Sequence, residues 1–296
     1  MSAAEYILGG KTVIFKQPYE PPADSDDLFV GREEELKLIL TSWIARPGKP
    51  AFAPVLIGKP GVGKTHLAYT AARLAERELY VFNGSYDVPG QDLAATFTTG
   101  DGSDPSEIRY LLSALATAMI RGAVFLLDEL GELHESALAM LLPLLDDQQV
   151  IESTLIGQRI RAHPRFRFIA TVNSADPICG RLTSNDKLAR RFDLIEVGDF
   201  SSRDIQTLIE RHFPANGSND QLLRHFWICW RRRHNDSLPT PADAFRIFRK
   251  AENIAEAEQL QTSGAWGSLE TNGLPLSIKH LEAAFERCVG ALVQKQ

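Results

Sequence analysis

One glycine-rich segment constrains the fold of this chain more than any other feature. Residues 58–65 read GKPGVGKT, between the apolar run Val55–Ile57 and an alanine-rich stretch with helical spacing. The pattern G-x-x-x-x-G-K-[ST] lets the backbone curl so that successive N–H groups point at one anion. The sequence therefore predicts a strand, a phosphate-binding loop and a helix, in that order.

The two residues after the last glycine of this segment supply the expected chemistry. The helix that begins at Lys64 directs its positive N-terminal end at the same anion. The Lys64 side chain is long enough to reach the β- and γ-phosphates of a nucleotide, and the Thr65 hydroxyl can ligate Mg²⁺. The alternative, an ordinary glycine turn, is disfavoured because the segment lies between a strand and a helix, as the mechanism requires.

A second apolar run, Val124–Leu127, is followed at once by Asp128 and Glu129. Open α/β sheets bind ligands at the carboxyl ends of their strands. Asp128 is expected to hold the Mg²⁺, usually through water, and Glu129 to orient or deprotonate a water that attacks the γ-phosphate. The alternative is an acidic strand end that faces solvent.

Two later positions are weaker candidates. Asn173 ends the apolar run Phe168–Val172, where an amide can fix the attacking water, although an Asx-turn at a strand end is common. Arg190 and Arg191 precede the last apolar run, and an arginine that reaches a neighbouring subunit's γ-phosphate would stabilise the charge developing there. The alternative for this arginine pair is a solvated basic face.

The pattern of the whole chain predicts two folded parts after an irregular N-terminal arm, residues 1–27. Apolar runs alternate with helical patterns in residues 28–200, which favours an α/β domain with a parallel sheet covered by helices on both faces. Residues 201–296 contain no strand-like run and are predicted to form a smaller all-α domain. Expected strands are 55–57, 79–82, 123–127, 166–172 and 194–197, and expected helices include 36–43, 64–77, 108–120 and 136–145.

Composition and the N-terminal sequence limit the cellular setting. The formal net charge is −6, so a nucleic-acid-coating surface is not expected, although a local basic patch remains open. The apolar runs fall short of the roughly 20 residues that span a bilayer, and residues 1–10 have no basic start before an apolar stretch. We therefore expect a cytoplasmic protein with reduced thiols at Cys179, Cys229 and Cys288.

The order of these motifs resembles AAA+ ATPases, and within them the MoxR-like group. Gly58–Thr65 is similar to the family's Walker A loop, and Phe125–Glu129 to its Walker B strand. Asn173 occupies the sensor 1 position, and Leu188–Phe192 resembles the stretch that carries the arginine finger. The MoxR-like character rests on residues 127–150 and on residues 157–173, which resemble the helix-2 insert hairpin and the strand that follows it.

The resemblance implies a P-loop NTPase core that binds ATP and Mg²⁺, followed by an α-helical lid. It also implies that Val30 and Gly31 pack near the adenine. The expected nucleotide-binding residues are Val30, Gly31, Gly58, Lys59, Pro60, Gly61, Val62, Gly63, Lys64, Thr65 and His66. The expected metal ligands are Thr65 and Asp128, and the expected catalytic residues are Lys64, Asp128, Glu129, Asn173 and Arg191, with Arg190 as the alternative finger.

One departure from the family pattern lies in the lid. A sensor 2 arginine usually follows a Ser-Pro or Ser-Thr pair at the start of a lid helix, and the matching place here is residues 240–243, which read TPAD. Arg246 lies about one helical turn further on and is the candidate substitute. The resemblance therefore leaves the contact between lid and nucleotide open.

The resemblance further implies a homo-oligomeric ring, commonly a hexamer, that acts as a chaperone on a protein client; a von Willebrand A-like domain is one candidate. The helix-2 insert, about residues 151–163, would then face the client. Two alternatives stay open. One is a nucleic-acid motor or loader that uses Arg159, Arg161, Arg165 and Arg167 around the insert. The other is a scaffold that binds ATP and scarcely hydrolyses it.

Overall fold

The computed structural model describes residues 5–21, 29–46, 48–99, 108–184, 187, 189–214, 216–217, 219–234, 237–263 and 274–293. The described residues group into two compact units. The first contains those of residues 1–23, 32–59 and 64–197, and the second contains those of residues 24–31, 60–63 and 198–296. The tip of the glycine-rich loop thus belongs to the second unit, and its two ends belong to the first.

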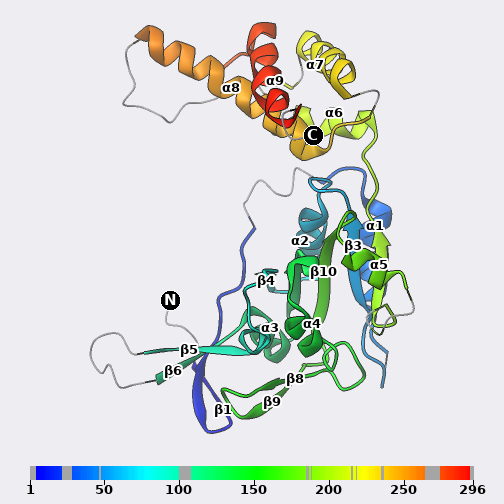
Figure 1. Ribbon diagram of the computed structural model, residues 1–296, viewed down its shortest axis with the longest axis vertical. Coiled ribbons are helices and arrows are strands. Elements are labelled where there is room, and N and C mark those ends of the chain that lie inside the picture. The colour runs from blue at the N-terminus through cyan, green and yellow to red at the C-terminus, as the bar shows by residue number, and fades with distance from the viewer. Residues whose placement is uncertain are drawn as a thin grey trace. The chain divides into compact units, whose positions relative to one another are not determined.

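A five-stranded parallel sheet forms the centre of the first unit (Figure 1). The strands lie in the order β11-β3-β10-β7-β4. Their bounds are β3 Ala53–Gly58, β4 Leu79–Asn83, β7 Val124–Asp128, β10 Arg167–Asn173 and β11 Phe192–Glu196. Side chains on both faces are buried, which explains why these strands read as continuous apolar runs. The predicted α/β class with a parallel sheet is confirmed.

Helices cover this sheet and connect its strands. They are α1 Glu33–Ser42, α2 Lys64–Leu74, α3 Ala114–Arg121, α4 Glu135–Leu141 and α5 Ile178–Leu182, with short 3-10 turns η2 Gly90–Leu93 and η3 Leu130–Glu132. Helix α2 follows β3 directly through the glycine-rich loop. Helix α1 contacts α2, and α3 packs against β4 and β7. Because the five strands are parallel, their carboxyl ends share one edge of the sheet.

The prediction of one helix over residues 108–120 is wrong. Residues Ile108–Leu112 form strand β6, which pairs antiparallel with β5, Ala95–Thr99. The helix α3 begins only after Ser113, whose hydroxyl accepts a hydrogen bond from the backbone N–H of Ala116. This N-cap fixes the point at which the chain changes from strand to helix.

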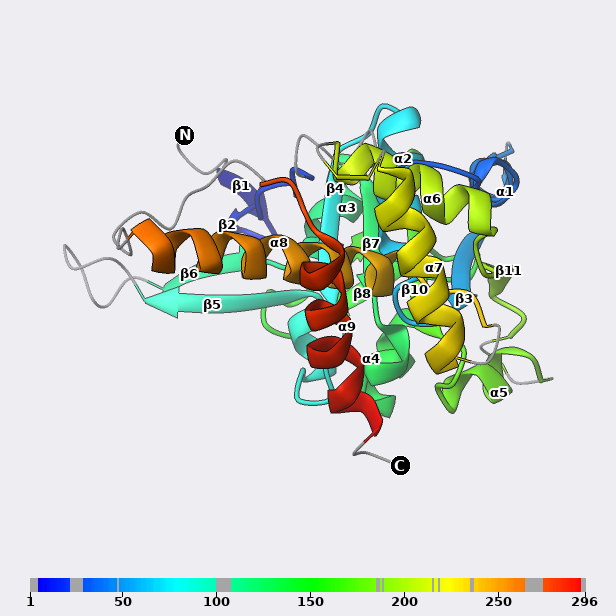
Figure 2. The same ribbon diagram turned by 90° about the horizontal axis from the view of Figure 1, so that it is seen from above.

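The glycines and prolines of the N-terminal arm predict an irregular segment, but part of the arm forms two strands. Strands β1, Glu5–Leu8, and β2, Lys11–Ile14, form a hairpin whose turn residues Gly9 and Gly10 both have positive φ. Strand β2 then pairs parallel with β6, which gives a second sheet in the order β1-β2-β6-β5 (Figure 2). Residues 1–4 and 22–27 of the predicted arm lie outside the described residues.

A hairpin is present where the resemblance implied one. Strands β8, Val150–Ser153, and β9, Gln158–Arg161, pair antiparallel. This hairpin lies between α4 and β10 and leads into β10. The identification of residues 151–163 as the helix-2 insert stays a prediction.

The second unit contains four helices in its described part. They are α6 Ser202–His212, α7 Asp220–His234, α8 Pro241–Ser263 and α9 Ile278–Val293. The side chains of Phe226, Phe248 and Phe285, one from each of α7, α8 and α9, are completely buried together. The all-α character predicted for this part of the chain is confirmed.

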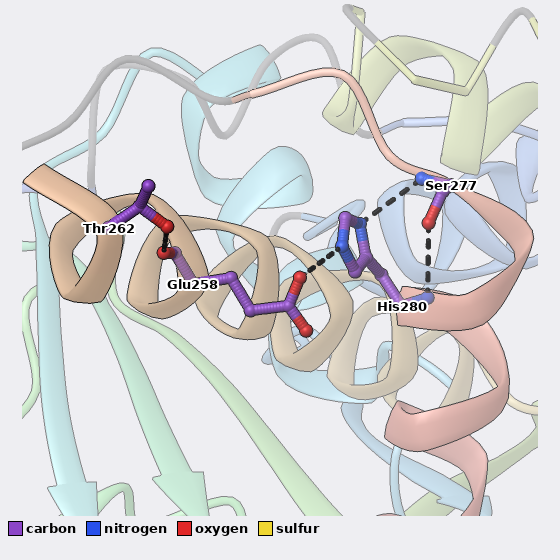
Figure 3. A network of polar contacts seen from close by, with 4 residues as sticks. All are labelled: Glu258, Thr262, Ser277 and His280. Atoms are coloured by element: carbon purple, nitrogen blue, oxygen red, sulfur yellow. Dashed lines mark hydrogen bonds and ion pairs between the residues drawn. The ribbon is translucent and has the colours of Figure 1, made fainter.

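A small polar network fixes the start of α9 against α8 (Figure 3). The backbone N–H of Ser277 donates to Nδ1 of His280 at 3.2 Å, and the N–H of His280 faces the Ser277 hydroxyl at 3.4 Å. Because Nδ1 accepts a bond, Nε2 carries the proton, and it lies 3.0 Å from the Glu258 carboxylate on α8. The network joins two helices across the 264–273 segment, which lies outside the described residues.

No helix in the described part of the chain combines the length and the apolar character that crossing a bilayer requires.

Candidate functional site

The glycine-rich loop leaves the sheet at the end of β3 and enters α2 at Lys64. Gly61 and Gly63 have φ values of +79° and +88°, a region that side chains other than glycine rarely adopt. Nothing lies near the position of an added Cβ at Gly63, so glycine is needed there for its backbone conformation alone. The loop therefore curls as the phosphate-binding pattern predicts.

Lys64 is the most constrained side chain of the site. Its Nζ donates to the carbonyl oxygens of Gly58 at 2.9 Å and Lys59 at 3.0 Å, and to Oδ1 of Asn173 at 2.9 Å. The residue is buried, and burial lowers the pKa of its ammonium group, an effect that the nearby carboxylates of Asp128 and Glu129 oppose. The ammonium is thus surrounded by oxygen acceptors of the kind that a phosphate also offers.

Thr65 and Asp128 meet at the start of α2. The Thr65 hydroxyl lies 3.0 Å from both carboxylate oxygens of Asp128, although the two residues are 63 positions apart in the chain. A hydroxyl and a carboxylate are hard oxygen ligands, which suit Mg²⁺. The described residues contain no group of three or more His, Cys, Asp and Glu side chains that could hold a metal. The Thr65 hydroxyl and the Asp128 carboxylate therefore fit a Mg²⁺ ion whose remaining ligands are water molecules and phosphate oxygens.

Sequence reasoning missed Thr171, a buried residue on β10 that holds both acidic residues. Its hydroxyl donates to Oδ1 of Asp128 and accepts a hydrogen bond from the backbone N–H of Glu129 at 3.0 Å. The signal was available, because alternate residues of a strand share a face and Thr171 lies two positions before Asn173. Thr171 is a positioning residue, since it acts through its neighbours.

Glu129 adopts a left-handed backbone conformation, with φ +59° and ψ +53°. Such a conformation is uncommon for a residue with a side chain and concentrates at functional sites. Gly84 packs directly on this turn: its N–H donates to the carbonyl of Asp128 at 2.7 Å, and an added Cβ would lie 2.2 Å from the carbonyl oxygen of Glu129. Gly84 is the second residue that sequence reasoning missed.

The sheet brings Gly58, Lys64, Thr65, Asp128 and Asn173 together from three neighbouring strand ends. In the register, Asn173 lies opposite Gly58, and Asp128 lies opposite Asn83. This convergence needs only that β3, β10 and β7 be adjacent and parallel. The amide of Asn173 uses its oxygen to accept from Lys64, which leaves its nitrogen as a donor.

The arginine pair does not join this group of residues within one chain. Arg191 donates to the carbonyl of Lys187 at 2.7 Å and lies 3.1 Å from Oδ2 of Asp146. The N–H of Asp147 and the guanidinium of Arg191 lower the pKa of the Asp146 carboxyl. Arg190 is exposed. Leu188, part of the predicted finger stretch, lies outside the described residues.

Three other predicted binding positions have different surroundings. Val30 packs against the apolar core of the helical unit, and an added Cβ at Gly31 would lie 2.8 Å from Cγ of Asp204. Nε2 of His66 is buried and makes no hydrogen bond within the described part of the chain, and burial lowers the pKa of its imidazole. The roles proposed for these positions toward a nucleotide stay predictions.

The loop tip, Pro60–Gly63, contacts residues of the same helical unit. An added Cβ at Gly61 would lie 2.7 Å from Cβ of Ala242 and 2.9 Å from the Thr240 hydroxyl, both at the start of α8. These residues occupy the place where the family's sensor 2 arginine is expected.

Residues 54–192 match the family model described as AAA domain (dynein-related subfamily). An uncharacterized protein of Staphylococcus saprophyticus is 30% identical over 201 residues, which cover 68% of this chain and 73% of the relative. An uncharacterized protein of Staphylococcus epidermidis is 26% identical over the same shares. The chain belongs to the AAA+ ATPases.

Solved structures agree with this assignment at the level of the fold. The Thermotoga maritima RuvB Holliday junction branch migration motor is 19% identical, with a TM-score of 0.54 over 88% of this chain and 70% of that one. A point mutant of the same motor gives a TM-score of 0.57 at 19% identity, over 90% of this chain and 73% of that one. At this identity the likeness shows the AAA+ fold alone.

We predict that Thr171→Val lowers ATP turnover by about tenfold to a hundredfold. The substitution keeps the shape of the side chain but removes the hydroxyl that orients Asp128 and the Glu129 backbone, the kind of loss that costs about 1.5–3 kcal/mol. Steady-state phosphate release measures kcat. Thr70→Val, on α2 away from the acidic pair, is the matched control, and equal activity of the two variants would contradict the assignment.

Proposed function

We propose that the protein binds and hydrolyses ATP with Mg²⁺ and couples hydrolysis to the remodelling or activation of a protein partner, as a MoxR-type AAA+ chaperone in the cytoplasm. One observation carries the hydrolytic part of this proposal. The buried Lys64 ammonium, the Thr65–Asp128 pair and Asn173 converge at the ends of β3, β7 and β10. A phosphate loop next to paired carboxylates is the arrangement that phosphoryl transfer to water requires.

The loop residues bind the triphosphate by exchange of partners. Lys64 releases the carbonyl oxygens of Gly58 and Lys59 and donates instead to phosphate oxygens, while the backbone N–H groups of residues 61–66 surround the same anion. Thr65 and Asp128 are placed to hold Mg²⁺, which when bound neutralises charge on the phosphate oxygens. The exchange also relieves the burial cost of the ammonium, because a phosphate carries full negative charge.

Glu129 and Asn173 act on the attacking water. The left-handed turn at Glu129 places its exposed side chain at the strand end, where it can accept the proton of the water. The amide nitrogen of Asn173 is free to donate to the water or to the γ-phosphate once its oxygen is engaged by Lys64. Thr171 and Gly84 keep the turn in one geometry, so that no rearrangement is needed during the reaction.

The site is complete only when a second copy supplies an arginine. Arg191, or Arg190 in its place, is distant in the fold from Lys64 because it precedes the start of β11, whereas the phosphate loop follows the end of β3. A homo-oligomeric ring, proposed as a hexamer, would bring this arginine to the adjoining site. Assembly would require Arg191 to leave Asp146, an exchange between an exposed carboxylate and a phosphate.

The lid of this chain offers arginines other than the missing sensor 2 residue. Arg246, Arg249, Lys250 and Arg287 line one groove of about 570 Å³ within the helical unit. Arg246 lies one turn after Ala242, which contacts the loop tip. We propose that Arg246 takes the sensor 2 role.

The surface of the second sheet favours a protein as the client. Large apolar side chains are exposed on its strands and at its edge, where a soluble monomer gains nothing from them. They are Tyr6, Ile7, Phe97 and Ile108, with exposures of 46%, 72%, 59% and 56%. A client with an apolar surface, a von Willebrand A-like domain being one candidate, would bind here rather than at residues 151–163.

The nucleic-acid alternative receives less support from the contacts of the four arginines on which it depended. Arg159 pairs with Glu152 at 2.7 Å, and Arg167 is buried among backbone carbonyls, so these side chains do not form one exposed basic surface. The alternative of a scaffold that binds ATP without hydrolysis differs from the proposal only in turnover.

We predict that Glu129→Gln retains ATP binding and lowers hydrolysis at least about a hundredfold, because the amide cannot accept the proton of the attacking water. Calorimetry with ATP and Mg²⁺ measures binding, and phosphate release measures hydrolysis. Glu132→Gln, three residues along on η3, is the matched control and should hydrolyse ATP normally. Turnover near the normal rate in Glu129→Gln would reject the base, and no turnover in the unmodified protein would favour the scaffold.

A mixing experiment tests the arginine contributed by the adjoining subunit. Lys64→Ala should lose nucleotide binding and Arg191→Ala should lose hydrolysis, so each is inactive alone. Mixed rings contain intact sites next to intact fingers, and we predict that mixing the two variants restores hydrolysis to a measurable fraction of normal. Full activity of Arg191→Ala alone would move the role to Arg190 or to another residue. If both variants are inactive alone, no recovery on mixing would contradict an arginine supplied by the adjoining subunit.

A further inference from the structure

A second cavity of about 790 Å³ lies within the first unit, away from the phosphate loop. Its wall includes Ala53 at the start of β3 and Arg167 and Phe168 at the start of β10. The phosphate loop follows the opposite end of β3, at Gly58, and Asn173, which contacts Lys64, lies at the opposite end of β10. The cavity is therefore at the other edge of the sheet and is separate from the site described above.

The charge of this cavity is unbalanced. Five cationic side chains line it against two acidic ones, Asp146 and Asp147. Asp146 is already paired with Arg191. The cations are Arg46, Lys49, Arg167, Arg190 and Arg191. Within the part of the chain that the structure describes, Arg46, Lys49, Arg167 and Arg190 form no ion pair, so the cavity retains a positive charge in a protein whose net charge is −6.

Arg167 is the strongest sign that an anion belongs in the cavity. Its side chain is buried, and it donates only to backbone carbonyls: Nε to Trp43 at 2.7 Å, and Nη1 to Pro164 at 3.0 Å and Phe166 at 2.6 Å. Its Nη2 has no hydrogen-bond partner among the described residues and is not enclosed, so it is available to the cavity. Burial, with Arg77 and Arg165 nearby, lowers its pKa to about 10.

Buried charges in proteins are normally paired, because an unpaired charge loses its solvation without compensation. A guanidinium fixed by three carbonyls, with one nitrogen left toward a cavity, is arranged to bind a carboxylate, sulfonate or phosphate. Arg46, Lys49 and Arg190, which also form no ion pair among the described residues, line the same cavity. Together these side chains form a binding site for an anion.

Large apolar side chains form another part of the wall. Ile44 and Phe52 are exposed at 64% and 68% although both are large hydrophobic residues, and Phe166 and Leu144 contribute buried apolar surface. Small-molecule sites commonly have volumes of about 300–1,000 Å³, apolar walls and a few convergent polar groups. An apolar wall next to a cluster of cations suits a ligand with a flat apolar body and an anionic end.

We propose that this cavity is a second ligand site, distinct from the phosphate loop, that binds a small organic anion with an apolar body. Arg167, Lys49 and Arg46 hold the anionic group, and Phe52 and Ile44 cover the apolar body. Because Arg190 and Arg191 share the wall, occupancy would also alter the surroundings of the proposed finger arginine.

The test uses 1-naphthyl phosphate as the probe and the full chain with Lys64→Ala, so that the phosphate loop does not compete for it. Calorimetry should show binding with a dissociation constant on the order of 0.5 mM or below, as expected for a ligand of this size. Inorganic phosphate and 1-naphthol, each carrying half of the proposed chemistry, should bind at least about tenfold more weakly.

Two substitutions of exposed wall residues locate the site without disturbing the buried Arg167. In the same background, Lys49→Glu and Phe52→Asp should each weaken binding at least about tenfold. Arg159→Glu, a charge reversal on the β8–β9 hairpin outside the cavity, should not change it. Circular dichroism and melting temperature confirm folding of each variant.

Three results would overturn the proposal. One is the absence of 1-naphthyl phosphate binding by the Lys64→Ala protein. The second is binding that Lys49→Glu and Phe52→Asp leave unchanged. The third is binding that disappears as the protein concentration is raised into the range of ring assembly, since another copy of the chain would then fill the cavity.

Discussion

The buried ammonium of Lys64 is the interaction on which the site depends. It joins the end of β3, the start of α2 and the end of β10, because its three acceptors come from Gly58, Lys59 and Asn173. A cation in that position is costly to bury unless oxygen atoms surround it. Three features of the fold supply these oxygen atoms: the loop after β3, the adjacency of β3 and β10, and the side chain of Asn173. Together they stabilise the buried Lys64 ammonium at the phosphate-binding loop.

The acidic side of the site depends on the neighbouring strand pair. Asp128 ends β7, and the hydroxyls of Thr65 and Thr171 approach its carboxylate from α2 and β10. The same Thr171 hydroxyl accepts from the Glu129 backbone, and Gly84 at the end of β4 leaves room for the Glu129 carbonyl. The ends of β4, β7 and β10 and the start of α2 therefore hold the two acidic residues in different surroundings: hydroxyls contact the Asp128 carboxylate, while the Glu129 side chain is exposed.

Local patterns were sufficient to predict the phosphate loop, the five core strands and the strand ends that carry Asp128 and Asn173, because each depends on a short run or on the rule that open α/β sheets bind ligands at the carboxyl ends of their strands. They failed where distant segments decide the structure. Strand β6 at Ile108 has a helical spacing and becomes a strand by pairing with β5 and β2. Gly84 looks ordinary in sequence, and only the fold shows that it packs on the Glu129 turn and that the Arg167 guanidinium donates to three backbone carbonyls.

The central claim is that the curled loop and Lys64 bind a nucleoside triphosphate by exchange of hydrogen-bond partners. A crystal structure of the full chain with Mg²⁺ and a non-hydrolysable ATP analogue tests it most directly. We expect the phosphates to lie within the loop, Nζ of Lys64 to have left the carbonyls of Gly58 and Lys59 for phosphate oxygens, and Thr65 to approach the metal. An analogue bound elsewhere, with Lys64 still on those two carbonyls, would contradict the account.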